Sequence, residues 1–464
     1  MTTYGTGGDF APFAALGLGL RDRGHEVLFA VEDPFLPTVR TLGFASQRIP
    51  GNSKEAIAGH HEELFNARNP LQPLRILLEK DVLPSLRGKV QGLLEVCQGT
   101  DVLLSAAFAP AAGIVAEITG VRWASVPLHP LSVPSRHLEM YPLPSTLPGP
   151  LRWFANRAML ALGQIKLRQI VDEPVNRIRA GYGLPPRRDL LGSGGTSKQL
   201  TAVATSPAFV PRPPDWPEHA KLTGFLFWDM VGLQVEGAEH RITEEIATFL
   251  DAPGDVVAVS SGSMAPWVGD AFTRFYRTSV AAIRRAGARA LVVGAAPGVL
   301  PEQVPEGVLS VPFAPFGQVY PRCSAVLHHG GIGTTAQGLR AGVPALVVPW
   351  GFDQFFNGAR IERIGAGRWM GRKYYTVERA TEAVRSLLEE SGYRRRARAI
   401  GAELTQEDGL EALCKEVEEL ACRPLGKGLP ALTGSQTLIT LPPRWRHDLG
   451  YPGGNPPSAA GSTL

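Results

Sequence analysis

Apolar runs with helical spacing alternate with short continuous apolar runs along the first 130 residues. Small and apolar residues from Phe13 to Leu20 recur at helical spacing, and charged residues and Gly24 follow them. The next elements that the pattern predicts are a strand at Glu26–Val31, a strand at Asp101–Ser105, a helix at Ala111–Thr119 and a strand at Trp123–Pro127. Strands that alternate with helices predict a parallel sheet with helices on both faces.

A second alternation of the same kind begins near residue 256. It predicts strands at Val256–Ser260, Ala290–Val293, Ala325–His328 and Ala345–Val348, and helices at Asp270–Ala286, Thr335–Ala341, Val377–Glu390 and Leu410–Ala421. The last two helices are expected to close this second half. The chain is therefore expected to be an α/β protein with two separate parallel sheets.

Proline marks the expected boundary between the halves. The segment Pro211–Pro217 contains four prolines, which fix φ and remove amide donors, so no regular element is expected there. We expect a first domain over residues 1–210, a linker over 211–235 and a second domain over 236–422. Residues 423–464 are rich in proline, glycine, serine and threonine and are expected to be a disordered tail.

Composition narrows the possible partners and compartments. The 464 residues carry a formal net charge of +4, far from the concentrated charge of a dedicated nucleic-acid binder. The four cysteines are widely spaced and form no CxxC pair, which fits a reducing, cytoplasmic compartment. No signal peptide and no apolar run long enough to cross a bilayer is recognised, so we expect a soluble protein.

The segment His328–Thr335, with the sequence HHGGIGTT, follows a predicted buried strand and opens a predicted helix. Its glycines allow close approach of the backbone, and free amides at a helix start suit a diphosphate. His328 can add a hydrogen bond or charge and Thr334 a hydroxyl. A ligand-free tight turn is the plainer interpretation. The residues from Gly331 to Ala336 also satisfy GxGxxA with Asp353 further on, which leaves a dinucleotide-dependent oxidoreductase open.

Asp353 and Gln354 follow the next predicted strand, after a proline and four more loop residues. An aspartate beside a glutamine offers several acceptors and two amide donors in a small space. This pairing suits vicinal sugar hydroxyls better than a single ribose, although a solvated loop acid beside an amide is the plainer alternative.

Taken in order, these motifs resemble the donor-sugar signature of family-1 nucleotide-sugar glycosyltransferases, in the UDP-glycosyltransferase superfamily. Within this superfamily the motifs are most similar to those of bacterial members that resemble sterol glucosyltransferases and to those of glycolipid rhamnosyltransferases. The segments that carry the resemblance are Gly5–Phe13, Asn176–Arg179, Gly183–Pro186, Asp215–Pro217, Thr223–Phe225, Ser261–Met264, Val311–Pro315, His328–Thr335 and Asp353–Asn357. The match runs from about residue 5 to about residue 421.

The resemblance implies two facing Rossmann-like domains of the GT-B type, with the acceptor bound mainly by the first and the donor by the second. It implies that His328, Gly331, Gly333, Thr334 and Ser263 hold the diphosphate. It also implies that Phe313 stacks on the nucleobase and that Asp353 and Gln354 contact the sugar. Phe313 as a core aromatic and Ser263 as a helix cap remain the plainer alternatives.

Asp9 is our prediction for the catalytic base. It follows the Gly5–Gly8 turn, at the position where similar sterol-type and antibiotic glycosyltransferases carry an aspartate base. A helix-capping acid is the plainer role for it. His25 competes by residue type, but it enters the second strand away from the glycine turn and is predicted to be structural. Only Met1–Tyr4 precede Gly5, so the first strand is expected to be short.

The predicted reaction is a single inverting displacement in which Asp9 accepts the proton of the acceptor hydroxyl and the nucleoside diphosphate leaves. The chain has no DxD triplet, so neither a metal nor another cofactor is expected, and the co-substrate is a nucleoside-diphosphate sugar. The acceptor is expected to be a small hydrophobic molecule or lipid. Basic residues among apolar ones over Leu151–Ile178 allow weak contact with a membrane surface, with a solvated helix face as the plainer alternative. A catalytically silent nucleotide-sugar-binding partner protein also remains open.

Overall fold

The structure is a computed structural model that describes residues 1–65, 72–139, 149–192, 194–228, 242–263, 268 and 272–424. Residues 1–424 form one compact unit. The predicted disordered tail therefore lies almost entirely outside the described residues, as do Met264 and the last part of the expected linker.

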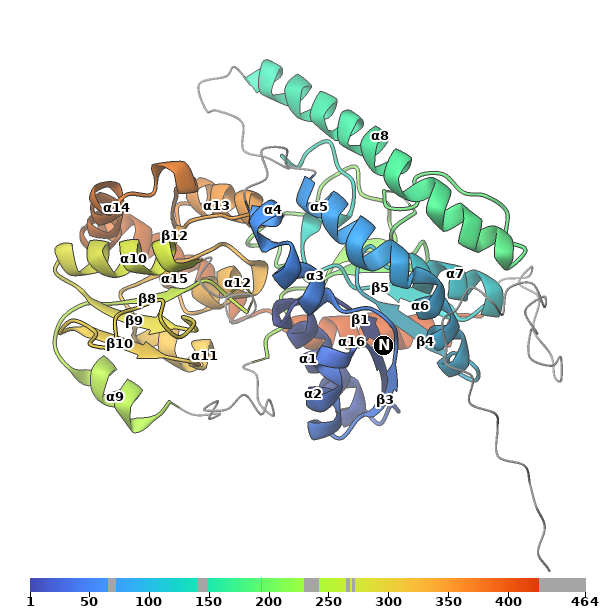
Figure 1. Cartoon of the computed structure of the whole chain (residues 1–464), viewed down its shortest axis with the longest axis horizontal. Helices are drawn as coiled ribbons and strands as arrows, with labels where there is room; N and C mark the ends of the chain where they lie inside the picture. Colours follow the sequence, from blue (N-terminus) through green and yellow to red (C-terminus); the bar gives the residue numbers. More distant parts are fainter. Residues whose placement is uncertain are drawn as a thin grey trace, which may run out of the picture. The chain divides into compact units, whose positions relative to one another are not determined.

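The first half of the chain builds a parallel sheet with the strand order β3-β2-β1-β4-β5-β6-β7 (Figure 1). Its strands are β1 (Thr2–Thr3), β2 (Leu28–Val31), β3 (Ala45–Arg48), β4 (Val102–Ser105), β5 (Arg122–Ser125), β6 (Leu200–Val203) and β7 (Ala220–Leu222). β1 has two residues, as short as expected, yet it lies between β2 and β4 in the middle of the sheet. The loop that follows β1 is the Gly5–Gly8 turn, which therefore leaves from the centre of the sheet.

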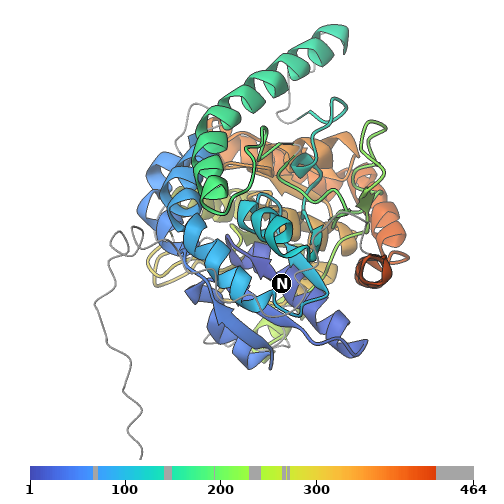
Figure 2. The same ribbon diagram turned by 90° about the vertical axis from the view of Figure 1, so that its right-hand side faces the viewer.

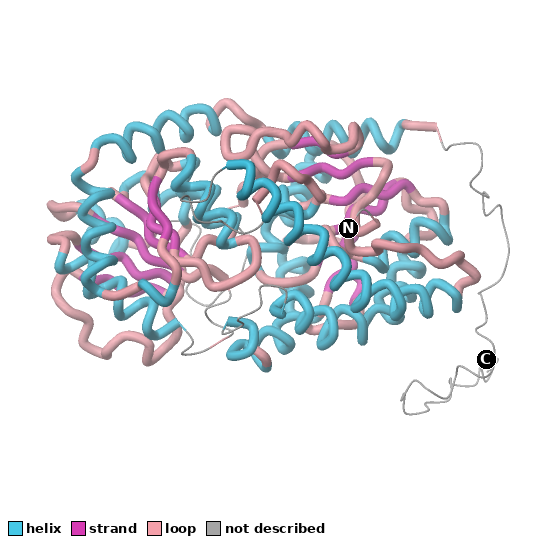
Figure 3. Tube along the Cα trace, turned by 90° about the horizontal axis from the view of Figure 1, so that it is seen from above, coloured by secondary structure: helices cyan, strands magenta, loops and turns pink. Residues whose placement is uncertain are grey.

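The second half builds another parallel sheet with the order β10-β9-β8-β11-β12-β13. Its strands are β8 (Val256–Ser260), β9 (Arg289–Val293), β10 (Val308–Val311), β11 (Ala325–His328), β12 (Ala345–Val347) and β13 (Gly367–Trp369). All five residues of β8 are buried, as expected for a strand covered on both faces. Figure 3 shows the two groups of strands, each with helices beside it.

Helices cover both sheets. In the first half they are α1 (Gly7–Asp22), α2 (Leu36–Thr41), α3 (Ser53–Gly59), α4 (His61–Phe65), α5 (Gln72–Leu77), a π-helical turn (Leu78–Val82), α6 (Leu83–Val96), α7 (Pro110–Thr119) and α8 (Gly149–Gly181). The others are α9 (Glu244–Asp251), α10 (Thr273–Arg285), α11 (Phe316–Val319), α12 (Ile332–Arg340), α13 (Gln354–Arg363), α14 (Val377–Glu389), α15 (Ser391–Leu404) and α16 (Gly409–Cys422). The predicted alternation of strands and helices is confirmed in both halves.

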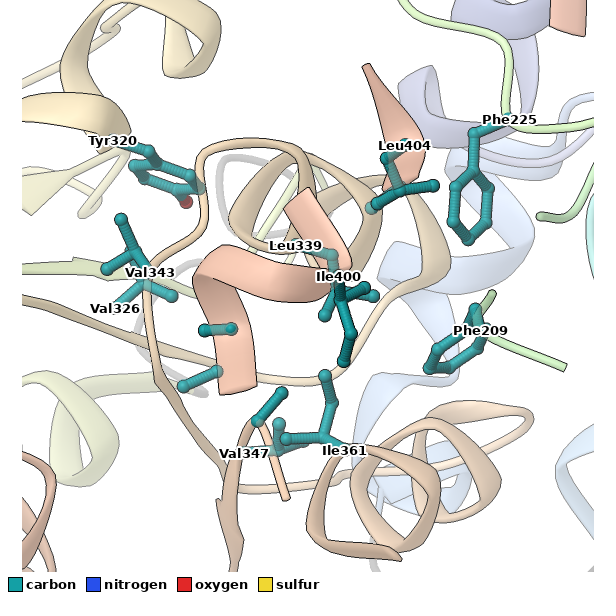
Figure 4. Packing of buried hydrophobic residues seen from close by; sticks show 14 of the residues in the cluster. Phe209, Phe225, Tyr320, Val326, Leu339, Val343, Val347, Ile361, Ile400 and Leu404 are labelled. Carbon is teal, nitrogen blue, oxygen red and sulfur yellow. The ribbon is translucent and has the colours of Figure 1, made fainter. Parts of the chain in front are cut away.

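The core on one face of the second sheet also includes residues from the first half of the chain. Leu339 of α12, Ile361 of α13 and Ile400 of α15 are buried there, and Phe209 and Phe225 pack into the same cluster (Figure 4). Phe209 and Phe225 flank β7, which itself lies inside the stretch expected to be linker. The proline-rich segment is therefore packed structure that holds the two sheets together rather than a free tether.

The last helix does not close the second half as expected. α16 packs against α1 and the first sheet, where Leu413, Cys414 and Leu420 are buried with Phe10 and Leu16. Arg23 beyond the end of α1 forms ion pairs with Glu411 and Glu418 of α16. The expectation failed because the apolar face of α16 predicts burial but does not say against which sheet.

Candidate active site

A cavity of about 300 Å³ opens between the loops that follow β1 and β11. Gly5, Thr6, Gly8 and Asp9 line it from the first half. The second half contributes Ser263, Gly331, Gly333, Thr334, Asp353 and Gln354. The structure thus brings seven of the nine predicted site residues to one cavity, all except His328 and Phe313.

The side chain of Asp9 is held by the start of its own helix. Thr6 is the N-cap of α1 and Asp9 the third helical residue, so the two form a capping box. Asp9 Oδ2 accepts hydrogen bonds from the Thr6 amide at 2.7 Å and from Thr6 Oγ1 at 3.0 Å. For Oδ1, no protein partner is found in the part of the chain that the structure describes. Asp9 therefore caps its helix with one oxygen and leaves the other on the cavity side.

Burial raises the pKa of Asp9, although the hydrogen bonds from Thr6 oppose this shift. The charge of Asp353 raises the pKa further and His129 lowers it, which places both groups near Asp9. A carboxylate with a raised pKa in a cavity is a stronger base than an ordinary aspartate.

Ser263, in the loop after β8, contacts the Gly5–Gly8 turn. Its Oγ accepts a hydrogen bond from the Gly8 amide at 3.0 Å, although the two residues are 255 positions apart in the chain. A Cβ on Gly7 would lie 3.3 Å from the Ser263 Cβ, so glycine permits this close approach. Ser263 therefore links the two halves of the chain, and its hydroxyl accepts from the amide of the second residue of α1, as a helix cap would. Its contact with a diphosphate stays a prediction.

The HHGGIGTT segment forms the expected turn between β11 and α12. Gly330 has a φ of +95°, and a Cβ there would lie 2.8 Å from Val347 Cγ1 and 3.0 Å from the Gln354 carbonyl oxygen. Only glycine fits this position without strain. α12 begins at Ile332, so Gly333 and Thr334 lie in its first turn at the cavity. The start of a helix carries free amides and the positive end of the helix dipole, and here it lies at the cavity.

The two histidines of this segment take different places. His328 is the last residue of β11, has no exposed surface and lies outside the cavity lining. Its Nδ1 accepts a hydrogen bond from the Gly330 amide at 3.0 Å. Burial lowers its pKa to about 3, so His328 supplies no positive charge at neutral pH. The structure places it beneath the turn, as a support for the glycine backbone.

His329, which the sequence interpretation did not select, lines the cavity. Its ring lies against Gly262, where a Cβ would meet His329 Cε1 at 2.3 Å. Burial lowers the pKa of His329 to about 4, and a hydrogen bond with the Ser260 backbone opposes this. Its Nδ1 is buried and has no partner among the described residues. The two histidines are adjacent in the sequence, so the motif alone does not tell which one reaches the cavity. The structure shows that it is His329.

Asp353 and Gln354 lie at the start of α13 and differ in what they can offer a ligand. Asp353 Oδ2 accepts a hydrogen bond from Asn357 Nδ2 at 2.7 Å, and Asn357 is fully buried. Gln354 Oε1 accepts hydrogen bonds from the amides of Trp350 and Gly351, at 2.8 and 3.1 Å. The Gln354 carbonyl is thus committed to the backbone, and its amide nitrogen remains for the cavity.

Phe352, just before Asp353, has a φ of +54°, which is uncommon for a bulky residue and concentrates at functional sites. It also lines the cavity. Phe313, the predicted base-stacking residue, is half-buried in the loop after β10 and lies outside the cavity lining. Its stacking on a nucleobase stays a prediction.

The first half also supplies an apolar wall that the sequence did not predict. It consists of Ile57, Leu74, Leu77, Leu78, Val82, Phe108 and Leu128. Asp81, in the π-helical turn, lies within this wall. The wall comes from α3, α5, the π-helical turn and the loops after β4 and β5. The relative placement of these segments depends on contacts between distant parts of the chain and leaves no local motif.

Within the described ranges, no three His, Cys, Asp or Glu side chains are grouped so that they could hold a metal ion. Nor is any helix in those ranges both long and apolar enough to cross a membrane.

Comparison with known proteins identifies the family. Residues 1–121 match the glycosyltransferase family 28 N-terminal domain, and residues 290–420 match the erythromycin biosynthesis protein CIII-like C-terminal domain. Over 438 residues the chain is 30% identical to O-mycaminosyltylonolide 6-deoxyallosyltransferase of Streptomyces fradiae, covering 91% of this chain and 97% of that protein. The chain belongs to this glycosyltransferase family.

More distant relatives agree with this assignment. The glycosyltransferase is 27% identical over 450 residues to the sterol 3-beta-glucosyltransferase of Debaryomyces hansenii, covering 90% of this chain and 27% of that protein. It thus spans about a quarter of the length of that relative. The predicted resemblance to sugar transferases is confirmed, which disfavours the dinucleotide-dependent oxidoreductase.

Solved structures show the same fold. The glycotransferase of kitacinnamycin superposes with a TM-score of 0.65 at 18% identity, covering 90% of this chain and 97% of that one. The spinosyn rhamnosyltransferase SpnG complexed with thymidine diphosphate gives 0.63 at 18% identity, with 90% and 98% covered. The glycosyltransferase has the GT-B fold, as predicted.

Proposed function

We propose that this glycosyltransferase moves a hexose from a UDP- or dTDP-linked donor to a hydroxyl of a small hydrophobic acceptor, with inversion and without a metal. One observation carries the proposal: a single cavity joins the Asp9 turn to the start of α12. Support for a dTDP-linked donor comes from SpnG, whose solved structure is complexed with thymidine diphosphate.

The donor diphosphate would lie at the start of α12. The amides of Gly333 and Thr334 and the helix dipole would stabilise negative charge there. They would stabilise the leaving diphosphate most as the bond between the anomeric carbon and the phosphate oxygen breaks and the bond to the acceptor oxygen forms. His329 is the ring at this end of the cavity. Anion binding beside it would raise its pKa from about 4 and favour its protonated, donating form. Asp353 and the Gln354 amide nitrogen would bind sugar hydroxyls.

Asp9 would act as the general base. Its Oδ1 is the oxygen left on the cavity side, and Oδ2 holds the side chain in place through Thr6. A base must lie within about 3 Å of the hydroxyl it deprotonates. The acceptor would enter from the apolar wall in the first half, and its oxygen would attack the anomeric carbon from the side opposite the diphosphate. The displacement would therefore invert the configuration.

The acceptor wall and α8 support a hydrophobic acceptor and contact with a membrane surface. Leu151, Phe154, Met159, Leu162 and Ile165 of α8 are exposed, with Phe154 at 65% and Leu162 at 62%. Figure 2 shows that the first part of α8 extends away from the other elements. Residues 149–171 contain four basic and no acidic residues. An exposed apolar stripe with basic flanks is typical of helices that lie on anionic bilayers.

A nucleotide panel followed by turnover tests this proposal. UDP or dTDP should raise the Tm of the protein, whereas GDP and NAD should not. The donor that matches should be hydrolysed or transferred in EDTA at the same rate as with added Mg²⁺, and NMR should show the inverted anomer first. Stabilisation by NAD alone would contradict a glycosyltransferase, and a strict metal requirement would contradict the metal-free mechanism.

The Asp9→Asn variant separates an enzyme from a silent nucleotide-sugar-binding protein. It should abolish transfer while nucleotide binding stays unchanged. Asp22→Asn, at the exposed end of the same helix, is the matched control and should behave as the wild type. Nucleotide binding without turnover for every donor, in the wild type as well, would mean that the chain is a binding partner.

A further inference from the structure

Ser53, the first residue of α3, makes a junction of hydrogen bonds beside the cavity. It is 3% exposed and lines the cavity close to Gly5. Its Oγ accepts a hydrogen bond from the Gly5 amide at 3.2 Å. The same Oγ lies 2.7 Å from Glu32 Oε2 and 3.1 Å from Asp81 Oδ2. A hydroxyl has one proton and two lone pairs, so these three contacts can be assigned by counting.

Glu32 takes the hydroxyl proton. Its Oε1 accepts a hydrogen bond from Lys89 Nζ at 2.8 Å, and both side chains are almost fully buried. Its Oε2 accepts from the Ser53 amide at 2.8 Å and from Ser53 Oγ. Glu32 thus accepts three hydrogen bonds, one of them from a buried ammonium group. Glu32 is also the nearer of the two carboxyl groups.

Because the Ser53 hydroxyl proton goes to Glu32, Asp81 Oδ2 lies against Ser53 Oγ without receiving a hydrogen bond from it. Ser53 Oγ uses one lone pair for Gly5 and has the other available. A proton on Asp81 Oδ2 would complete the contact, with Asp81 donating to Ser53. Asp81 Oδ1 accepts from the Asn52 amide at 3.2 Å, so the remaining oxygen keeps an accepting role. Burial also raises the pKa of Asp81, opposed by the charge of Lys89.

We propose that Asp81 carries a proton in the working enzyme and is a positioning residue, donating to Ser53 and so holding the turn that carries Asp9. The link runs from Asp81 through Ser53 to Gly5. A Cβ on Gly5 would lie 2.4 Å from Asp9 Oδ2, so the Asp9 carboxyl rests directly on this glycine. Displacement of Gly5 would therefore displace the oxygen atoms of Asp9.

The charged and titratable groups around Asp81 come from four elements. Lys89 of α6 and Glu32 after β2 affect the Asp81 charge, and Asp81 in turn affects Tyr4 after β1. The Tyr4 hydroxyl is committed to the carbonyls of Ala107 and Phe108. Asp9 is the remaining carboxyl of this half on the cavity. Lys89 and Glu32 compensate each other, so loss of the Asp81 proton would add an uncompensated negative charge.

Stability against pH tests the proton without any activity. A buried acid with a raised pKa stabilises the fold most when protonated, so wild-type stability should fall as pH rises toward that pKa. Asp81→Asn keeps one donor and one acceptor and cannot ionise. Its Tm should exceed the wild-type value by a margin that grows as pH rises above the ordinary aspartate pKa of 3.8 and levels off above the raised pKa of Asp81. Glu79→Gln, exposed in the same π-helical turn, is the control and should show no such trend. A destabilised Asp81→Asn at neutral pH would overturn the proposal.

The pH profile of donor hydrolysis tests the link to Asp9, and this arm rests on the proposed function. The wild-type kcat should fall on the alkaline side as Asp81 ionises, and Asp81→Asn should remove that fall. Asp81→Ala should lower kcat at every pH while the KM for the donor stays unchanged, since the donor lies in the other half. An alkaline limb unchanged in Asp81→Asn would refute the positioning role. If no donor is hydrolysed, the proposed function fails and the stability experiment still decides the protonation.

Discussion

Replacement of Gly262 by alanine should disable the nucleotide site through a single methyl group. Gly262 has a φ of +78°, and its Cβ would meet His329 Cε1 at 2.3 Å and Nε2 at 2.8 Å. The left-handed conformation alone costs about 1–2 kcal/mol in any non-glycine residue. The new methyl group would also push the His329 ring out of its place. This ring has no free space on its other side, because it lies against Gly331, where a Cβ would be 2.5 Å from His329 Nε2.

A matched glycine separates the two contributions. Gly287 has a φ of +86° with no atom within 4 Å of its Cβ, so Gly287→Ala measures backbone strain alone. Gly287→Ala should lose about 1–2 kcal/mol of unfolding free energy, and Gly262→Ala should lose more because its methyl group also meets His329. Calorimetric titration of UDP or dTDP should show affinity reduced about tenfold or more in Gly262→Ala, about 1.4 kcal/mol, and unchanged in Gly287→Ala.

A double-mutant cycle with His329→Ala identifies the cause. In that background the clash is absent, so Gly262→Ala should cost only the backbone strain. Nucleotide affinity in Gly262→Ala equal to that of the wild type would refute the reasoning that His329 and the Gly262 loop form one rigid wall of the donor site.

Four further outcomes are expected. Because burial raises the pKa of Asp9, transfer should decline on the acid side at a pH above that of an ordinary aspartate, and a limb near pH 3.8 would contradict a buried base. Asn357 Nδ2 holds both Asp353 and the Gly330 carbonyl, so Asn357→Ala should raise the donor KM several-fold and also weaken UDP or dTDP binding, and an unchanged KM would count against this support of the site. Leu413→Ala, at a fully buried position, should cost about 2–5 kcal/mol in chemical unfolding, and a cost below 1 kcal/mol would mean that α16 is not part of the core. Phe154→Glu should reduce sedimentation of the protein with vesicles of phosphatidylcholine and phosphatidylglycerol, whereas Val304→Glu, at another exposed apolar position, should not. Equal loss in both variants, or no binding by the wild type, would count against membrane contact through α8.

The sequence predicted the parts of the fold that depend on local pattern. The strand at Val256–Ser260 and the strand at Ala325–His328 have the expected bounds because both are fully buried apolar runs. α1 begins at Gly7, well before the expected Phe13, because the capping box of Thr6 and Asp9 starts the helix within glycines. Glycine has low helix propensity, so periodicity alone did not extend the helix to it.

The sequence predicted the site less completely, because the direction in which each side chain points depends on the folded strands and not on the motif. Asp9, Ser263 and Asp353 reach the cavity because they follow strand ends, which parallel sheets bring to one edge. His328 and His329 are neighbours, so chemistry alone could not choose between them. In the strand register, His328 turns into the core and His329 reaches the cavity.

The packing of α16 makes the first half a discontinuous domain. Its core is completed by Leu413 and Leu420, so the part of the chain that forms the second sheet is an insertion within it. During synthesis, the second sheet can assemble before the first has its final helix. Exchange of the first halves between related glycosyltransferases would therefore have to carry α16 along with residues 1–210. A junction placed only at the proline segment would leave each hybrid with a mismatched core.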